Sequence, residues 1–153
     1  LLKRSYSIST HKDVNVYLTT PQVDDVSLSG SGDVKLVDKF NAATDVKFSL
    51  SGSGILKGEI NAPAVKASIS GSGDMTLKGE TKDVSLSIAG SGDFEGDELM
   101  AENADVKIAG SGDADVYASV KLDAKIAGSG NVNYKGTTEI SSSVVGSGTV
   151  RKK

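Results

Sequence analysis

The chain has 153 residues and a net charge of −3 at neutral pH, and 37% of its residues are hydrophobic. This length suits one domain, and so slight a charge predicts neither a nucleic-acid partner nor a membrane surface as partner. No apolar stretch approaches the roughly 20 residues that a membrane span needs. The chain has no cysteine and one histidine, His11, which excludes disulfides and thiolate metal sites and argues against zinc sites and histidine-based triads.

The chain opens with strand-like sequence, in which Val14, Val16 and Leu18 alternate with polar residues. No signal peptide is recognisable at this end. A repeat domain normally begins with a polar cap, which this segment lacks. We therefore expect residues 1–25 to be opening strands, the remainder of a truncated N-terminal part that carried any targeting signal.

From residue 26 onward the sequence repeats, and we predict a repeat domain over residues 26–153. The tripeptide Gly-Ser-Gly occurs seven times, at steps of 22, 19, 19, 20, 18 and 18 residues. A near-constant period of this size indicates one supersecondary unit that is stacked on its neighbours. The paired glycines are expected to form a corner with positive φ angles. They are Gly30, Gly32, Gly52, Gly54, Gly71, Gly73, Gly90, Gly92, Gly110, Gly112, Gly128, Gly130, Gly146 and Gly148.

Strands are predicted on both sides of each corner. The position two residues before each motif is always aliphatic, the position before that is always polar, and this period-two alternation is typical of a strand with one buried face. A second apolar column begins four residues after the first glycine. Since aromatic residues make up 5% of the chain and tryptophan is absent, the interior is expected to hold small aliphatic side chains.

These patterns predict an all-β fold, a single-stranded solenoid in the form of a parallel β-helix of about seven coils. Equivalent positions would then stack about 4.8 Å apart. A right-handed helix is favoured because its coils tolerate uneven lengths such as the 22-residue step, whereas a left-handed coil of hexapeptides would need aliphatic residues at six-residue steps. A β-sandwich is the alternative, because regular turn signals can also mark hairpins.

An aspartate follows four of the motifs, namely Asp33, Asp74, Asp93 and Asp113. Such a ladder of carboxylates could bind calcium, which prefers oxygen ligands. The same position holds Asn131 and Thr149 in two coils, which keep an acceptor and lose the charge. We therefore predict that these side chains accept a hydrogen bond from the corner backbone, as in an Asx-turn, and that the chain has no metal site and needs no cofactor.

One carboxylate pair resembles catalytic chemistry. Stacking would place Glu95 beside Asp115 on adjacent coils, about 5 Å apart, as in a retaining glycosidase. An exposed column would leave neither carboxyl desolvated enough to act as the acid, so surface charge is the favoured interpretation and no catalytic residue is predicted.

A polar ladder is predicted on the strands before the motif. Its members would hydrogen-bond sugars or another flat surface, or would only keep an exposed sheet polar. The candidates for contact with a ligand are Ser27, Ser49, Ser68, Ser87, Lys107 and Lys125.

The segment from Val14 to Leu36, VNVYLTTPQVDDVSLSGSGDVKL, leads through Pro21 into the first corner, and GSGD-type corners follow it along the chain. In this it resembles the head GIN domain of putative auto-transporter adhesins. The resemblance implies a β-solenoid that is exported to the periplasm or cell surface, and it supplies no catalytic residues.

The favoured function is thus a non-enzymatic, exported binding module. It would present repeated polar faces to glycans or cell-surface proteins, without nucleic-acid partners. Two alternatives stay open: a polysaccharide-cleaving β-helix enzyme that uses Glu95 and Asp115, and a purely structural scaffold of the cell envelope.

Overall fold

The structure is a computed structural model that describes residues 23–153, so the predicted opening strands lie almost wholly outside the described residues. All regular structure in the described part is β-strand. The strands are β1 (Asp25–Gly30), β2 (Asp33–Lys35), β3 (Phe40–Asn41), β4 (Val46–Gly52), β5 (Ile55–Gly71), β6 (Asp74–Gly90), β7 (Phe94–Gly96), β8 (Leu99–Gly110), β9 (Ala114–Tyr117), β10 (Lys121–Gly128), β11 (Asn131–Lys135), β12 (Glu139–Gly146) and β13 (Thr149–Lys152).

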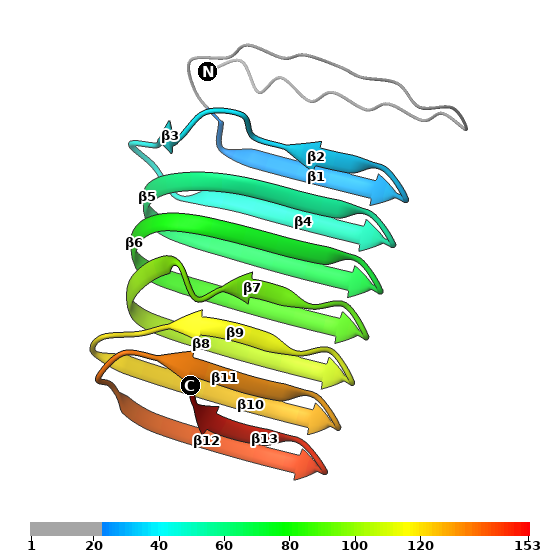
Figure 1. The fold of residues 1–153 in the computed structure, drawn as a ribbon, viewed down its shortest axis with the longest axis vertical. Helices are drawn as coiled ribbons and strands as arrows, with labels where there is room; N and C mark the ends of the chain where they lie inside the picture. Colours follow the sequence, from blue (N-terminus) through cyan, green and yellow to red (C-terminus); the bar gives the residue numbers. More distant parts are fainter. Residues whose placement is uncertain (1–22) are drawn as a thin grey trace.

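The strands pair in parallel and build a solenoid of about seven turns, as Figure 1 shows. The predicted all-β parallel solenoid is confirmed, and the β-sandwich alternative is wrong. We call the face made by β1, β4, residues 64–71 of β5, residues 83–90 of β6, β8, β10 and β12 the leading face, because its strands run into the Gly-Ser-Gly corner. The trailing face runs out of that corner to a second corner, where β5 and β6 bend without a break.

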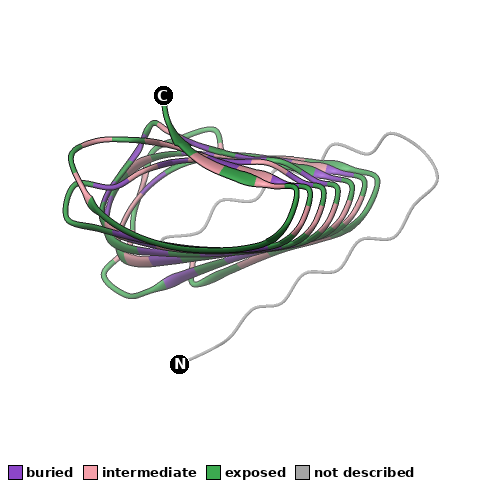
Figure 2. Cartoon of the chain, turned by 90° about the horizontal axis from the view of Figure 1, so that it is seen from below, coloured by how far each residue is buried: buried purple, intermediate pink, exposed green. Residues whose placement is uncertain are grey.

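The Gly-Ser-Gly corners stack in register along the whole solenoid. Gly30 is paired with Gly52, and the alignment continues coil by coil to Gly146. In the end-on view of Figure 2 these corners superpose, whereas the loops of the second corner spread apart. Coils of 18 to 22 residues therefore take up their differences in length at the second corner.

The two glycines of each corner are required for different reasons. Gly110 has a φ of 136°, and a Cβ there would lie 2.2 Å from the carbonyl oxygen of Gly90 in the preceding coil. That oxygen accepts the N–H of Ser111 at 2.9 Å, so a side chain would occupy the path of a hydrogen bond between coils. Gly112 has no positive φ, but its Cβ would lie 2.1 Å from the oxygen of Gly92. Positive φ, predicted for all the corner glycines, thus occurs only at the first of each pair.

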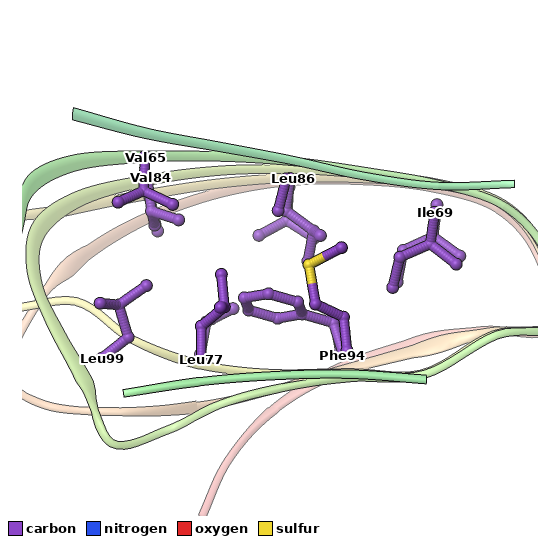
Figure 3. Close-up of a cluster of buried hydrophobic side chains, with 14 of the residues drawn as sticks. Val65, Ile69, Leu77, Val84, Leu86, Phe94 and Leu99 are labelled. Carbon is purple, nitrogen blue, oxygen red and sulfur yellow. The ribbon is translucent and has the colours of Figure 1, made fainter. Parts of the chain in front are cut away.

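The core lies between the two faces and follows the predicted apolar columns. Figure 3 shows Ile69, Val84 and Leu86 of the leading face meeting Leu77 and Phe94 of the trailing face. The inward residues two positions before the motif are almost fully buried from the second coil to the sixth: Leu50, Ile69, Ile88, Ile108 and Ile126.

The core also holds the aromatic rings of Phe48 and Phe94 beside the expected aliphatic side chains. Phe48 and Phe94 are 0% and 2% exposed. In each case the next residue in the same column is alanine: Phe48 pairs with Ala67, and Phe94 with Ala114. A ring beside a methyl group fills the space shared by two coils, which keeps the interior close-packed.

Alanine substitution of two corner glycines tests the stacking. Gly110→Ala places a Cβ against the Gly90 carbonyl, whereas Gly30→Ala meets no atom of residues 23–153 within 4 Å although its φ is 111°. Both variants carry the cost of alanine at positive φ, roughly 1–2 kcal/mol. We expect Gly110→Ala to lower the free energy of unfolding by at least about 2 kcal/mol more than Gly30→Ala in urea titrations. Equal losses would contradict close stacking at the corner.

Candidate functional site

The structure brings the six predicted ligand-facing residues into one column on the leading face. Successive pairs are in register, from Ser27 and Ser49 through Ser87 and Lys107 to Lys125. Five of the six are exposed and Ser49 is half-buried. We call this column the serine ladder. Its serine hydroxyls make no side-chain hydrogen bond to another described residue, so their donors and acceptors face solvent.

Charged residues lie beside the serine ladder. Lys107 Nζ is 3.4 Å from Asp105 Oδ2, and Lys125 Nζ is 3.8 Å from an oxygen of Asp123. The lysine side chains keep 56% and 57% of their surface exposed, and such surface pairs contribute little to stability. Both ammonium groups can therefore turn to another acceptor at little cost.

The corner aspartates form a ladder of hydrogen bonds between coils. The Asp113 N–H donates to Asp93 Oδ1 at 2.9 Å, and the Asn131 N–H donates to Asp113 Oδ1 at 2.7 Å. Asn131 Oδ1 in turn accepts the N–H of Thr149 at 3.2 Å. The acceptor thus serves the next coil, and not its own corner as in the predicted Asx-turn. The reason is that stacking brings the N–H of the next coil within reach. Asn131 continues the ladder because its Oδ1, like a carboxylate oxygen, accepts the N–H of the next coil.

Metal ligation has no support in this part of the chain. Among residues 23–153 no group of three or more histidine, aspartate or glutamate side chains is placed to hold a metal ion.

Glu95 and Asp115 are neighbours on β7 and β9, in register on the trailing face. Both carboxylates already have partners. Glu95 Oε2 accepts the hydroxyl of Thr76 at 3.2 Å, and Asp115 accepts the Asn133 amide at 2.7 Å and pairs with Lys153. Glu95 also lines a small surface depression of about 130 Å³. Glu95 is exposed and Asp115 is half-buried, and neither carboxylate lies in an enclosed site that would desolvate a catalytic acid.

One ion pair of the trailing face reaches across two coils. Lys135 Nζ lies 2.7 Å from Asp97 Oδ2, and its hydrogen bond lowers the pKa of Asp97 below the ordinary 3.8. A lowered carboxyl pKa stabilises the fold above the unfolded-state value, and this contribution is lost as pH falls through the lowered pKa. Similarly, the hydrogen bond to Asp115 raises the pKa of Lys153. These bonds join separate coils, so they support the stack.

A second hollow, of about 320 Å³, lies at the second corner and was not predicted. We call it the corner hollow, and it is lined by Glu80, Thr81, Met100, Ala101, Glu102, Tyr117 and Ser119. Met100 is 47% exposed, although Leu99 and Ala101 on either side are buried. Leu99, Met100 and Ala101 are all apolar, so no alternation in the sequence marked Met100 as the outward residue. The unequal coil lengths hid which residues of β6, β8 and β9 meet there.

The sequence from residue 2 to residue 138 matches the family model described as putative auto-transporter adhesin, head GIN domain. The chain belongs to this family. The family relationship places the chain with adhesin-like proteins, for which an extracytoplasmic or surface location is implied. None of the residues described in this GIN domain forms a helix long and apolar enough to cross a membrane.

Three solved structures share the fold of this GIN domain. A putative lipid binding protein from Parabacteroides distasonis is 33% identical with a TM-score of 0.77, and the match covers 86% of the present chain and 55% of that protein. A putative adhesin from the same species is 29% identical, with a TM-score of 0.81 and coverages of 86% and 57%. A putative adhesin from Parabacteroides merdae is 27% identical, with a TM-score of 0.75 and the same coverages as the second.

The GIN domain chain thus spans slightly more than half the length of these solved relatives. Comparison with curated proteins finds no match.

Two substitutions of Asp113 distinguish a corner hydrogen bond from a cation site. Asp113→Ala removes the acceptor of two hydrogen bonds from Asn131 and should lower the free energy of unfolding by about 1–3 kcal/mol. Asp113→Asn keeps an oxygen acceptor and should lose less than half as much. Thermal unfolding with and without calcium completes the test. An asparagine variant as unstable as the alanine variant, together with a melting temperature that rises with calcium, would contradict the capping role.

Proposed function

We propose that this GIN domain is a non-enzymatic, extracytoplasmic adhesive module whose leading face binds an extended ligand, of which a glycan chain is the favoured class. The observation that carries the proposal is the serine ladder, a column of exposed serines and lysines in register over six coils. Fold alone does not imply this function, so the argument depends on the chemistry of the face.

The geometry of the serine ladder suits repeated weak contacts. Its residues recur at about 4.8 Å along the solenoid axis, the spacing of neighbouring strands. Each serine hydroxyl can donate and accept, and Lys107 and Lys125 add donors at one end. Linked weak contacts along one chain add up to useful avidity. Since the paired strands hold the backbone of the ladder in place, little backbone conformational entropy is lost when a ligand binds.

The surroundings of Glu95 and Asp115 favour binding over cleavage. Asp115 is paired with Lys153 and bonded to Asn133, and Glu95 is exposed. A polysaccharide-cleaving enzyme would need one of them as a protonated acid in an enclosed site. A structural scaffold would need neither a ligand nor free hydroxyls on the leading face.

Retention on immobilised polysaccharides and host glycans tests the proposal, with released reducing ends measured in the same samples. A phospholipid vesicle arm is included because one solved relative is described as a putative lipid binding protein. The test variant is Ser68→Ala/Ser87→Ala, which removes two adjacent hydroxyls of the serine ladder. The matched control is Ser72→Ala/Ser91→Ala, which removes two exposed hydroxyls at the glycine corner.

We expect the parent protein to be retained on at least one glycan without releasing reducing ends. The ladder variant should bind that glycan about tenfold more weakly, and the control variant should bind it as the parent does. If the parent protein releases reducing ends and the Glu95→Gln variant does not, the enzymatic alternative is established instead. Retention by vesicles alone would replace the glycan with a lipid. Absence of any retention would favour the scaffold.

A further inference from the structure

We propose that the corner hollow is a separate binding site for one neutral or amino-substituted pyranose ring. The proposal does not rest on the function of the serine ladder, because the hollow lies at the second corner, where β6 bends and β8 begins (Figure 1). Its volume of about 320 Å³ is at the lower end of the range for small-molecule pockets, about 300–1,000 Å³. It therefore suits one sugar ring and not an extended chain.

The floor of the corner hollow is apolar. Met100 exposes nearly half of its surface, and its neighbour Ala101 is buried beneath the hollow. Tyr117, at the end of β9, adds a half-buried ring. The ring is packed by the next coil, because a Cβ built on Gly136 would lie 3.5 Å from Tyr117 Cζ. A thioether beside an aromatic ring offers a surface for the C–H face of a sugar.

The rim of the corner hollow supplies acceptors and few donors. The carboxylates of Glu80 and Glu102 make no ion pair and no side-chain hydrogen bond with another described residue. The aliphatic hydroxyl protons nearby are already used: Thr81 Oγ1 donates to the Asp83 carbonyl at 3.1 Å, and Ser119 Oγ donates to the Ala101 carbonyl at 3.3 Å. The phenol of Tyr117 is the one hydroxyl donor left among the side chains that line the hollow. A ligand that fits must therefore bring donors for the two carboxylates.

A pyranose meets these conditions with hydroxyl donors at its rim and an apolar C–H face. The two carboxylates would repel an acidic sugar, whereas a neutral sugar or an ammonium substituent would be accepted. The carboxylates would each hold a hydroxyl through a charge-assisted hydrogen bond, which is about twice as strong as a neutral one. The specificity of the hollow is thus set by charge at the rim and by the apolar floor.

The test is an NMR titration of the uniformly ¹⁵N-labelled chain with methyl glycosides of glucose, galactose, N-acetylglucosamine and glucosamine. Glucuronate and tetramethylammonium chloride are titrated as an acidic sugar and as a cation without hydroxyls. We expect at least one of the first four sugars to give saturating shifts confined to residues 80–81, 100–102 and 117–119. Glucuronate should give none.

Variants at the corner hollow assign the contacts. Glu80→Gln and Glu102→Gln keep the shape of the side chain and should each weaken the sugar about tenfold. Met100→Ser should weaken it as well. The matched control is Val145→Ser, because Val145 is an exposed aliphatic residue of β12, 72% accessible and remote from the hollow in sequence and strand. The control should bind with unchanged affinity.

Three results would overturn the proposal: no saturating shift with any of the four sugars, saturation by tetramethylammonium alone, or glutamine variants that bind like the parent chain. Failure of the serine-ladder experiment is distinguishable from these results. If Ser68→Ala/Ser87→Ala leaves glycan retention unchanged while the hollow still responds to sugar, only the proposed function of the leading face is contradicted.

Discussion

The contact between backbones at the Gly-Ser-Gly corner is the constraint on which the rest of the structure depends. The carbonyl oxygen of each first glycine accepts the N–H of the serine in the next coil, from Gly30 and Ser53 at 3.0 Å to Gly128 and Ser147 at 3.0 Å. A Cβ on either glycine of this corner after the first coil would approach a carbonyl oxygen to 2.5 Å or less. Glycine is therefore what permits the hydrogen-bonded stack, and the stack fixes the register of both faces.

Register at the corner determines which chemistry each surface can carry. Because residues two apart along a strand point the same way, each outward position becomes a column that runs the length of the solenoid. The serine ladder and the aspartate ladder are both products of this alignment. The second corner has no such constraint, so its loops differ from coil to coil. That freedom allowed Met100 and Tyr117 to come together in a hollow.

The sequence predicts the columns well because they depend only on spacing from the glycine pair. Ile88 and Ile108 are buried and in register, and Glu95 lies beside Asp115. Features that depend on contacts between unlike residues were not predictable in this way. The inward position of Phe94 follows from its column, but the room for its ring depends on Ala114 in the next coil and on Gly96, whose Cβ would lie 2.2 Å from the ring. Similarly, the corner hollow depends on loop lengths that period alone does not specify.

Distances between pairs of spin labels along the serine ladder test the stacked register most directly. The chain has no cysteine, so labels can be placed by substituting cysteine at exposed positions of the ladder column, which Ser143 of β12 extends by one coil. Residues 68 and 143 are four coils apart, 27 and 125 five, and 27 and 143 six. Pulsed electron paramagnetic resonance should give mean distances of about 19, 24 and 29 Å, which rise by one strand spacing per coil. Distances that do not increase by this constant step would contradict the account.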